Sequence, residues 1–101
     1  MSAQLILSED STVVVSKDQV YSELQGEAVI LDVKSGIYYG LNEVGASIWN
    51  LIQEPKTVGE IKEALLAEYE VEPQTCDRDL LAILKDLIVK GLVHVINETS
   101  T

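Results

Sequence analysis

Two runs of alternating hydrophobicity, separated by a short turn that contains a glycine, restrict the fold of this chain more than any other feature. From Glu27 to Val33 hydrophobic residues recur at every second position, which is typical of a strand. The turn Lys34-Ser35-Gly36 follows, and Ile37–Leu41 then forms a second apolar run. We therefore predict a β-hairpin over residues 27–41.

Three helices are predicted after this hairpin. Asn42 is a good N-cap for the first helix, and Thr57 with Glu60 forms a capping-box pattern for the second. Thr75 opens the third helix after a proline, and Gly91 supplies its C-terminal stop. The predicted helices run from about Glu43 to Ile52, from Thr57 to about Glu70, and from Thr75 to about Lys90.

Shorter apolar pieces predict the remaining strands, at Ser11–Ser16, Val20–Leu24 and Leu92–Ile96. Residues 97–101 form a polar tail, which we expect to be frayed. The order of these strands and helices along the chain predicts an α+β fold of the winged helix-turn-helix type. It has a three-stranded antiparallel sheet followed by three helices and a short C-terminal strand. With 101 residues, the chain is expected to form a single domain over residues 1–101.

The composition excludes several classes of partner. Seventeen acidic and seven basic side chains give a formal net charge of −10. This charge repels phosphate groups and anionic lipid over a Debye length of about 8 Å, so we expect no nucleic acid and no membrane as partners. No signal peptide or membrane span is visible, and Cys76 is the single cysteine, so a cytoplasmic location is expected.

No residue constellation predicts catalysis. The glycines do not form a phosphate-binding loop, and neither a serine elbow nor a pair of acids stands out. His94 is the only histidine and lacks the cysteine or carboxylate spacing of a metal site. Trp49 is expected to be a structural anchor. We therefore predict no catalytic residue, no metal and no cofactor, and a protein that is not an enzyme.

Several residues recur at fixed spacing across the hairpin and the first helix: Gly36, Tyr38, Leu41, Asn42, Gly45, Ile48 and Trp49. This segment resembles the signature of the PqqD family, which is roughly G-x-Y-x-x-L-N-x-x-G-x-x-I-W. The likeness extends over about residues 26–95, since Thr57, Glu68-Tyr69 and the Leu87-x-x-x-Gly91-Leu92 segment also match family positions.

The resemblance implies a recognition protein for the leader of a ribosomally synthesised, post-translationally modified peptide. Stand-alone lasso-peptide relatives are slightly more similar than others in the linker Glu68–Pro73 and in length. The leader would add as a strand to the third strand of the sheet and be covered by the third helix. The implied partners are the precursor leader peptide and a leader protease, cyclase or other tailoring enzyme.

Candidate peptide-binding residues follow from that binding mode. Ile37–Leu41 is expected to lie at a sheet edge, where Ile37 and Tyr39 share the parity of Leu41 and Tyr38 points the opposite way. On the third helix, residues at the margin of the apolar stripe could form the wall of a groove. Each could equally be an ordinary core or solvated residue. The candidates are Ile37, Tyr38, Tyr39, Asp77, Arg78, Leu81, Lys85 and Ile88.

Three alternatives remain at this point. One is the peptide chaperone of pyrroloquinoline quinone biosynthesis, from the same family. Another is a winged-helix DNA-binding regulator, which charge disfavours because Arg78, Lys85 and Lys90 are balanced by three aspartates on the third helix. The last is a structural subunit that stabilises an enzyme without contacting its substrate.

Overall fold

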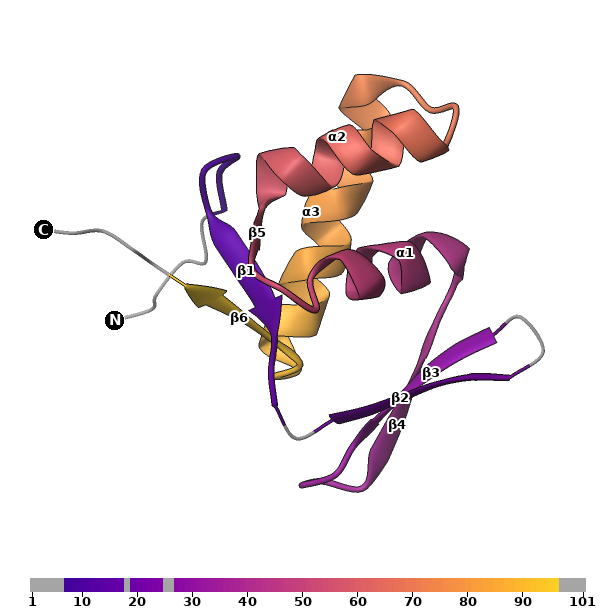
Figure 1. The fold of residues 1–101 in the computed structure, drawn as a ribbon. Helices are drawn as coiled ribbons and strands as arrows, with labels where there is room; N and C mark the ends of the chain where they lie inside the picture. Colours follow the sequence, from indigo (N-terminus) through magenta and orange to yellow (C-terminus); the bar gives the residue numbers. More distant parts are fainter. Residues whose placement is uncertain (1–6, 18, 25–26, 97–101) are drawn as a thin grey trace, which may run out of the picture.

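The structure, a computed structural model, describes residues 7–17, 19–24 and 27–96 (Figure 1). The predicted frayed tail, residues 97–101, lies outside the described residues. Antiparallel sheets and three helices make an α+β fold, as predicted. The elements in chain order are β1 (Thr12–Val15), β2 (Gln19–Leu24), β3 (Glu27–Asp32), β4 (Ile37–Leu41), α1 (Glu43–Leu51), β5 (Lys56–Thr57), α2 (Val58–Glu68), α3 (Pro73–Val89) and β6 (Val93–Ile96).

The strands form two sheets, whereas the sequence predicted one sheet and a short C-terminal strand. The predicted three-stranded antiparallel sheet is present, in the order β2-β3-β4. A second sheet has the order β5-β1-β6, in which Val13 pairs with both Lys56 and Val95. This pairing was missed because it joins segments that are far apart in the sequence, and Figure 1 shows β1 between β5 and β6.

The hairpin of β3 and β4 forms as predicted. Gly36 has a φ of 73°, a conformation that glycine adopts without steric cost, and its N–H donates to the Asp32 carbonyl at 2.7 Å. The Asp32 carboxylate accepts hydrogen bonds from the Lys34 N–H at 3.3 Å and from the Ser35 hydroxyl at 3.0 Å. The turn therefore satisfies its own polar groups and fixes the register in which Ile30 pairs with Tyr39.

Both predicted N-caps are confirmed. The Asn42 side chain accepts a hydrogen bond from the Gly45 N–H at 2.8 Å, at the start of α1. At the start of α2 the capping box is complete: the Glu60 N–H donates to the Thr57 hydroxyl at 3.1 Å, and the Thr57 N–H donates to the Glu60 carboxylate at 2.9 Å.

The third helix begins two residues before the predicted start. α3 starts at Pro73, which occupies the first helical position where a missing N–H costs nothing. Thr75 therefore lies inside the first turn and is not the residue that opens the helix. The predicted stop is confirmed: Gly91 has a φ of 78°, and the Leu92 N–H donates to the Leu87 carbonyl at 2.9 Å.

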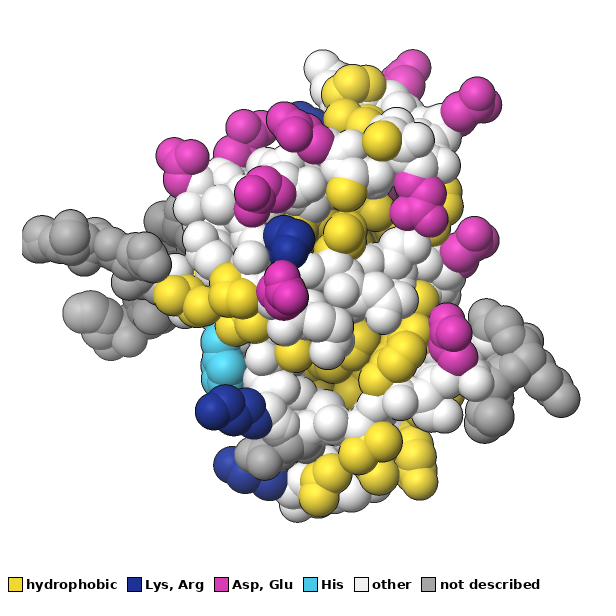
Figure 2. Space-filling model, in the orientation of Figure 1, with side chains coloured by type: hydrophobic (Ala, Val, Ile, Leu, Met, Phe, Trp, Pro, Cys, Tyr) yellow, Lys and Arg dark blue, Asp and Glu magenta, His cyan; other side chains and the backbone are white. Residues whose placement is uncertain are grey.

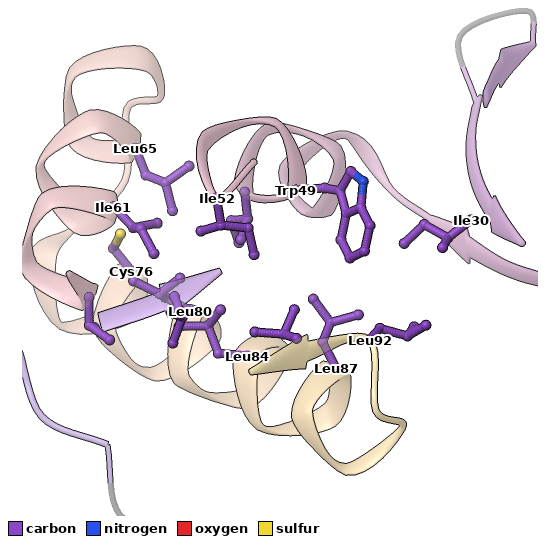
Figure 3. Close-up of a cluster of buried hydrophobic side chains, with 14 residues drawn as sticks. Ile30, Trp49, Ile52, Ile61, Leu65, Cys76, Leu80, Leu84, Leu87 and Leu92 are labelled. Carbon is purple, nitrogen blue, oxygen red and sulfur yellow. The ribbon is translucent and has the colours of Figure 1, made fainter. Parts of the chain in front are cut away.

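One hydrophobic core joins the helices to both sheets (Figure 3). Trp49 points from α1 toward Ile30 of β3 and is only 2% exposed, as expected for a structural anchor. Leu80 and Leu84 of α3 are fully buried against the other helices and strands. Because α3 contributes the centre of this core, its position relative to β4 is determined by packing.

Candidate functional site

β4 is an edge strand, as predicted. In the order β2-β3-β4 it pairs with β3 on one side, and no other strand of the described residues pairs with its second side. Its outward N–H and C=O groups are therefore available to another extended chain. Tyr39 and Leu41 pack against the core, whereas Tyr38 lies on the opposite face with Val20 and Leu31. The alternation predicted for this strand is therefore confirmed for Tyr38, Tyr39 and Leu41.

A groove lies beside this edge, between β4 and α3. Its volume is about 160 Å³. Hydrophobic side chains from α3 form one wall, and the last residues of β4 with the start of α1 form the other. We define the β4–α3 groove by its lining residues: Gly40, Leu41, Asn42, Gly45, Ile83, Asp86 and Leu87.

Two glycines, Gly40 and Gly45, line the strand side of the groove. A Cβ atom on Gly40 would meet nothing within 4 Å, so a small residue here leaves space next to the edge. A Cβ on Gly45 would approach the Asn42 side-chain oxygen to 3.2 Å and the Leu41 side chain to 3.4 Å. Glycine at position 45 thus allows the cap of α1 to sit close against the end of β4.

Lys90 contacts the middle of β4 through Tyr39. Its ammonium group lies 5.1 Å from the centroid of the Tyr39 ring, a cation–π geometry. The same ammonium group donates to the Asp86 carboxylate at 2.8 Å, one turn earlier in α3. These two contacts join the C-terminal turn of α3 to the middle of β4.

An apolar pocket adjoins the groove along α1, because Val44 lines the pocket and its neighbour Gly45 lines the groove. The pocket has a volume of about 90 Å³ and lies between α1, α2 and α3. At its rim the Tyr69 and Ser47 hydroxyl oxygens are 2.8 Å apart, within hydrogen-bonding distance. Burial raises the pKa of the Cys76 thiol, which lines the pocket, and so favours its uncharged form.

The candidate residues on β4 are placed in two environments. Tyr39 is half-buried and lies under Lys90 at the end of α3, while Ile37, the first residue of the strand, is 48% exposed. Tyr38 is 69% exposed on the outer face of the sheet. Of the three, Tyr39 therefore lies nearest to the covered part of the edge.

The candidate residues on α3 are not brought together with β4. Asp77 and Leu81 line a different hollow, with Leu7 and Val58, and Asp77 accepts a hydrogen bond from Lys62 at 3.0 Å. That hydrogen bond raises the pKa of the Lys62 ammonium group. Arg78 and Lys85 are exposed, and Ile88 packs at the margin of the core. A peptide-binding role for these five residues stays a prediction.

The α3 residues that do face β4 were not among the candidates. Ile83, Asp86, Leu87 and Lys90 recur at helical spacing on one flank of the apolar stripe. Leu81 and Ile88 lie on the other flank. The sequence shows the stripe and both of its margins, but which margin faces the strand depends on how the helix packs.

Comparisons with known proteins agree with this architecture. One solved structure, described as TbiB1 in complex with the TbiA(beta) leader peptide, is 36% identical and covers 84% of this chain and 99% of that chain, with a TM-score of 0.75. A lasso peptide synthetase B1 complexed with the leader peptide is 26% identical, covers 81% and 96% of the two chains, and gives a TM-score of 0.72.

A more distant structure shares the fold. The PqqD truncation of Methylobacterium extorquens PqqCD, described as a stand-alone RiPP recognition element, is 18% identical and covers 88% of this chain and 95% of that chain, with a TM-score of 0.74. No curated protein matches the chain.

Two further findings concern the class of protein. Within the described ranges, no helix combines the length and the hydrophobicity that crossing a bilayer requires. Residues 27–93, which include the β3–β4 hairpin and all three helices, match the family described as Coenzyme PQQ synthesis protein D (PqqD). The chain belongs to the PqqD family.

Proposed function

We propose that this protein binds the leader of a ribosomally synthesised precursor peptide by strand addition and delivers it to a leader protease or other modifying enzyme. One observation carries the proposal: among the residues that the structure describes, no strand pairs with the second side of β4, which faces α3 across a groove. A chain of the same fold, 36% identical, has been solved in complex with a leader peptide. The protein itself breaks no bond in this scheme.

The groove suits an extended peptide. A strand added to β4 satisfies the outward backbone groups of the edge, which supplies affinity for any sequence. Its side chains alternate, so that every second one points toward Ile83 and Leu87. These hydrophobic walls supply specificity for apolar leader residues at that spacing.

The proposed leader-binding residues differ from those predicted from the sequence on α3 and not on β4. Ile37 and Tyr39 lie along the edge and remain contact residues, with Tyr38 on the outer face. On α3, the proposal assigns leader contact to Ile83, Asp86 and Leu87, because these residues line the groove. Asp77, Arg78, Leu81, Lys85 and Ile88 lie on other faces of the helix and are proposed contacts only for a second partner.

A role in lasso-peptide biosynthesis is supported better than a role in pyrroloquinoline quinone synthesis. The two most similar structures named above are a TbiB1 and a lasso peptide synthetase B1, at 36% and 26% identity, compared with 18% for the PqqD truncation. The order of three helices followed by a strand also supports the winged helix-turn-helix classification, which remains part of the proposal.

Fluorescence anisotropy of a labelled leader tests the function. The probes are the fluorescein-labelled TbiA(beta) leader and the leader of the precursor encoded beside this gene, each titrated with purified protein at moderate salt. We expect saturable binding of at least one leader at micromolar or lower protein concentration, and loss of binding when that leader is scrambled. Failure of both leaders, or equal binding of the scrambled peptide, contradicts the proposal.

A further inference from the structure

The outer face of the β2-β3-β4 sheet, opposite the hydrophobic core, is apolar and partly exposed. A hollow of about 480 Å³ lies on this face. Residues from all three strands line it: Val20, Ser22, Val29, Leu31 and Tyr38. Figure 2 shows hydrophobic side chains at the lower end of the molecule, where this sheet lies, whereas acidic side chains gather around α2 at the upper end.

The sequence of β3 is typical of a strand that is covered on both faces. Residues 28–31 form a continuous apolar run, whereas an antiparallel sheet with one solvated face usually alternates hydrophobic and polar residues. Ala28 and Ile30 are buried on the inner face, but Val29 and Leu31 are only partly buried on the outer face. The outer face therefore offers apolar surface that a bound partner can cover.

The strand register places Tyr38 at the end of an apolar row on this face. Val20 pairs with Leu31, and Leu31 pairs with Tyr38. The row ends there because no strand of the described residues pairs with the second side of β4. A strand added to β4 extends the row by one residue, whose side chain lies beside Tyr38.

Gly40 leaves room for a large side chain next to Tyr38. It lies two residues farther along β4, and so on the same face of the sheet. A Cβ atom on Gly40 would meet nothing within 4 Å, and its cross-strand partner Val29 lines the hollow. An aromatic ring beside Tyr38 can therefore stack on the tyrosine ring and extend diagonally over the glycine.

We propose that the outer face is a second specificity site for the leader, in which Tyr38 packs against an aromatic leader side chain. This inference rests on the proposed function and adds a requirement to it. The β4–α3 groove contacts leader residues that point inward, whereas Tyr38 contacts one that points outward. The aromatic residue is thus next in sequence to the inward-pointing residue beside Tyr39. The protein selects leaders that are apolar on both faces of the added strand.

A phenylalanine scan of the leader tests the proposal. The probe is the leader that binds in the anisotropy titration, with phenylalanine or serine placed at each position in turn. We expect phenylalanine to bind about two- to fivefold more tightly than serine at one outward position, as for a favourable cross-strand pair. In Tyr38→Thr this gain is expected to disappear, while gains at inward positions persist. Gains at inward positions are expected to fall in Ile83→Ala, which keeps the outward gain.

Val20→Thr is the matched control for Tyr38→Thr. Val20 belongs to the same row and is 53% exposed, but β3 separates its strand from β4. Neighbouring strands lie about 4.8 Å apart, so Val20 is about 14 Å from a strand added to β4 and cannot contact the leader. Both variants place threonine, a residue that suits strands, at an exposed position. Circular dichroism verifies that each variant is folded.

Two outcomes overturn the inference and leave leader binding established. One is a scan in which no gain from phenylalanine depends on Tyr38. The other is an equal loss of the gain in Val20→Thr, because the general hydrophobicity of the outer face, and not contact with Tyr38, then supplies it. If no leader binds to the original protein, the proposed function itself is wrong, and the inference is lost with it.

Discussion

The ammonium group of Lys90 lies 5.1 Å from the centre of the Tyr39 ring, and this contact holds the last turn of α3 over the middle of β4. The two residues are distant in sequence, and each borders a surface that the other does not. Tyr39 belongs to the edge strand, while Lys90 also lines a concave surface between the two sheets. The contact therefore lies next to the space between the edge strand and the helix that an added strand must fit.

Replacing Lys90 tests this contact. Lys90→Met removes the cation and leaves a side chain of similar length, so Tyr39 loses its charged partner. With a leader that lacks acidic residues, we expect the affinity measured by anisotropy to fall about two- to fivefold, in line with an exposed cation–π interaction. Lys90→Arg keeps the charge and should bind like the original protein. Equal binding by the methionine variant argues against the contact.

Strand addition predicts a periodic response in the leader backbone. Only alternate N–H groups of an added strand point toward β4, so N-methylation should weaken binding at every second leader residue. Each sensitive position is expected to cost about tenfold in affinity, because one hydrogen bond is lost and a β4 carbonyl is left unpaired. A scan of singly methylated peptides without this two-residue period would contradict the edge-strand mode.

Ile83 and Leu81 form a matched pair on opposite flanks of α3. Both are half-buried, but Ile83 lines the β4–α3 groove and Leu81 lines the hollow beside Leu7. We expect Ile83→Ala to lower leader affinity about tenfold through lost hydrophobic contact, and Leu81→Ala to change it less than twofold. The reverse order would support the sequence-based prediction that Leu81 forms the groove wall.

Truncating a side chain of α3 to alanine should lower the free energy of unfolding much more at a buried position than at an exposed one. Leu84 is fully buried, whereas Val89, five residues later, is 80% exposed. Leu84→Ala is expected to lower the free energy of unfolding by about 2–5 kcal/mol, because it removes methyl groups and leaves a cavity. Val89→Ala should change it by less than about 0.5 kcal/mol. Urea unfolding followed by circular dichroism measures both, and similar values for the two would contradict the packing.

Cys76 provides a test of the pocket beside the groove. Burial raises the pKa of its thiol, so the folded protein holds less thiolate at neutral pH than an exposed cysteine does. We expect iodoacetamide to modify Cys76 at least about tenfold more slowly in native protein than in urea at the same pH. Since an acid with a raised pKa stabilises the folded state only while it is protonated, stability should fall as pH rises through the alkaline range. Rapid labelling of the folded protein would show the thiol to be exposed.

Local features of the structure could be predicted from short stretches of sequence. The turn at Gly36, the cap at Asn42 and the capping box of Thr57 and Glu60 each depend on contacts within a few residues. Residues that are close in sequence contact one another regardless of how the rest of the chain folds. The edge position of β4 follows from the same reasoning, because a hairpin that runs directly into a helix leaves one side of its second strand without a neighbour.

The second sheet and the flank of α3 that faces β4 could not be predicted in this way. β1 pairs with β6 at the opposite end of the chain, and no local pattern indicates that partner. On α3 the apolar stripe is visible in the sequence, but the sequence does not show whether the flank with Ile83 or the flank with Leu81 faces the strand. Packing of Leu80 and Leu84 into the common core sets the rotation of the helix and so selects Ile83 for the groove.

The sequence by itself determined the hairpin, the side-chain caps of α1 and α2, and the acidic net charge, because each of these is local or additive. Only the tertiary structure decided that residues 17, 34, 90 and 94 line one concave surface between the two sheets. Charges summed along a chain show nothing about their distribution. That distribution depends on long-range pairing of β1 with β6 and of β3 with β4, which places the four side chains around a single opening.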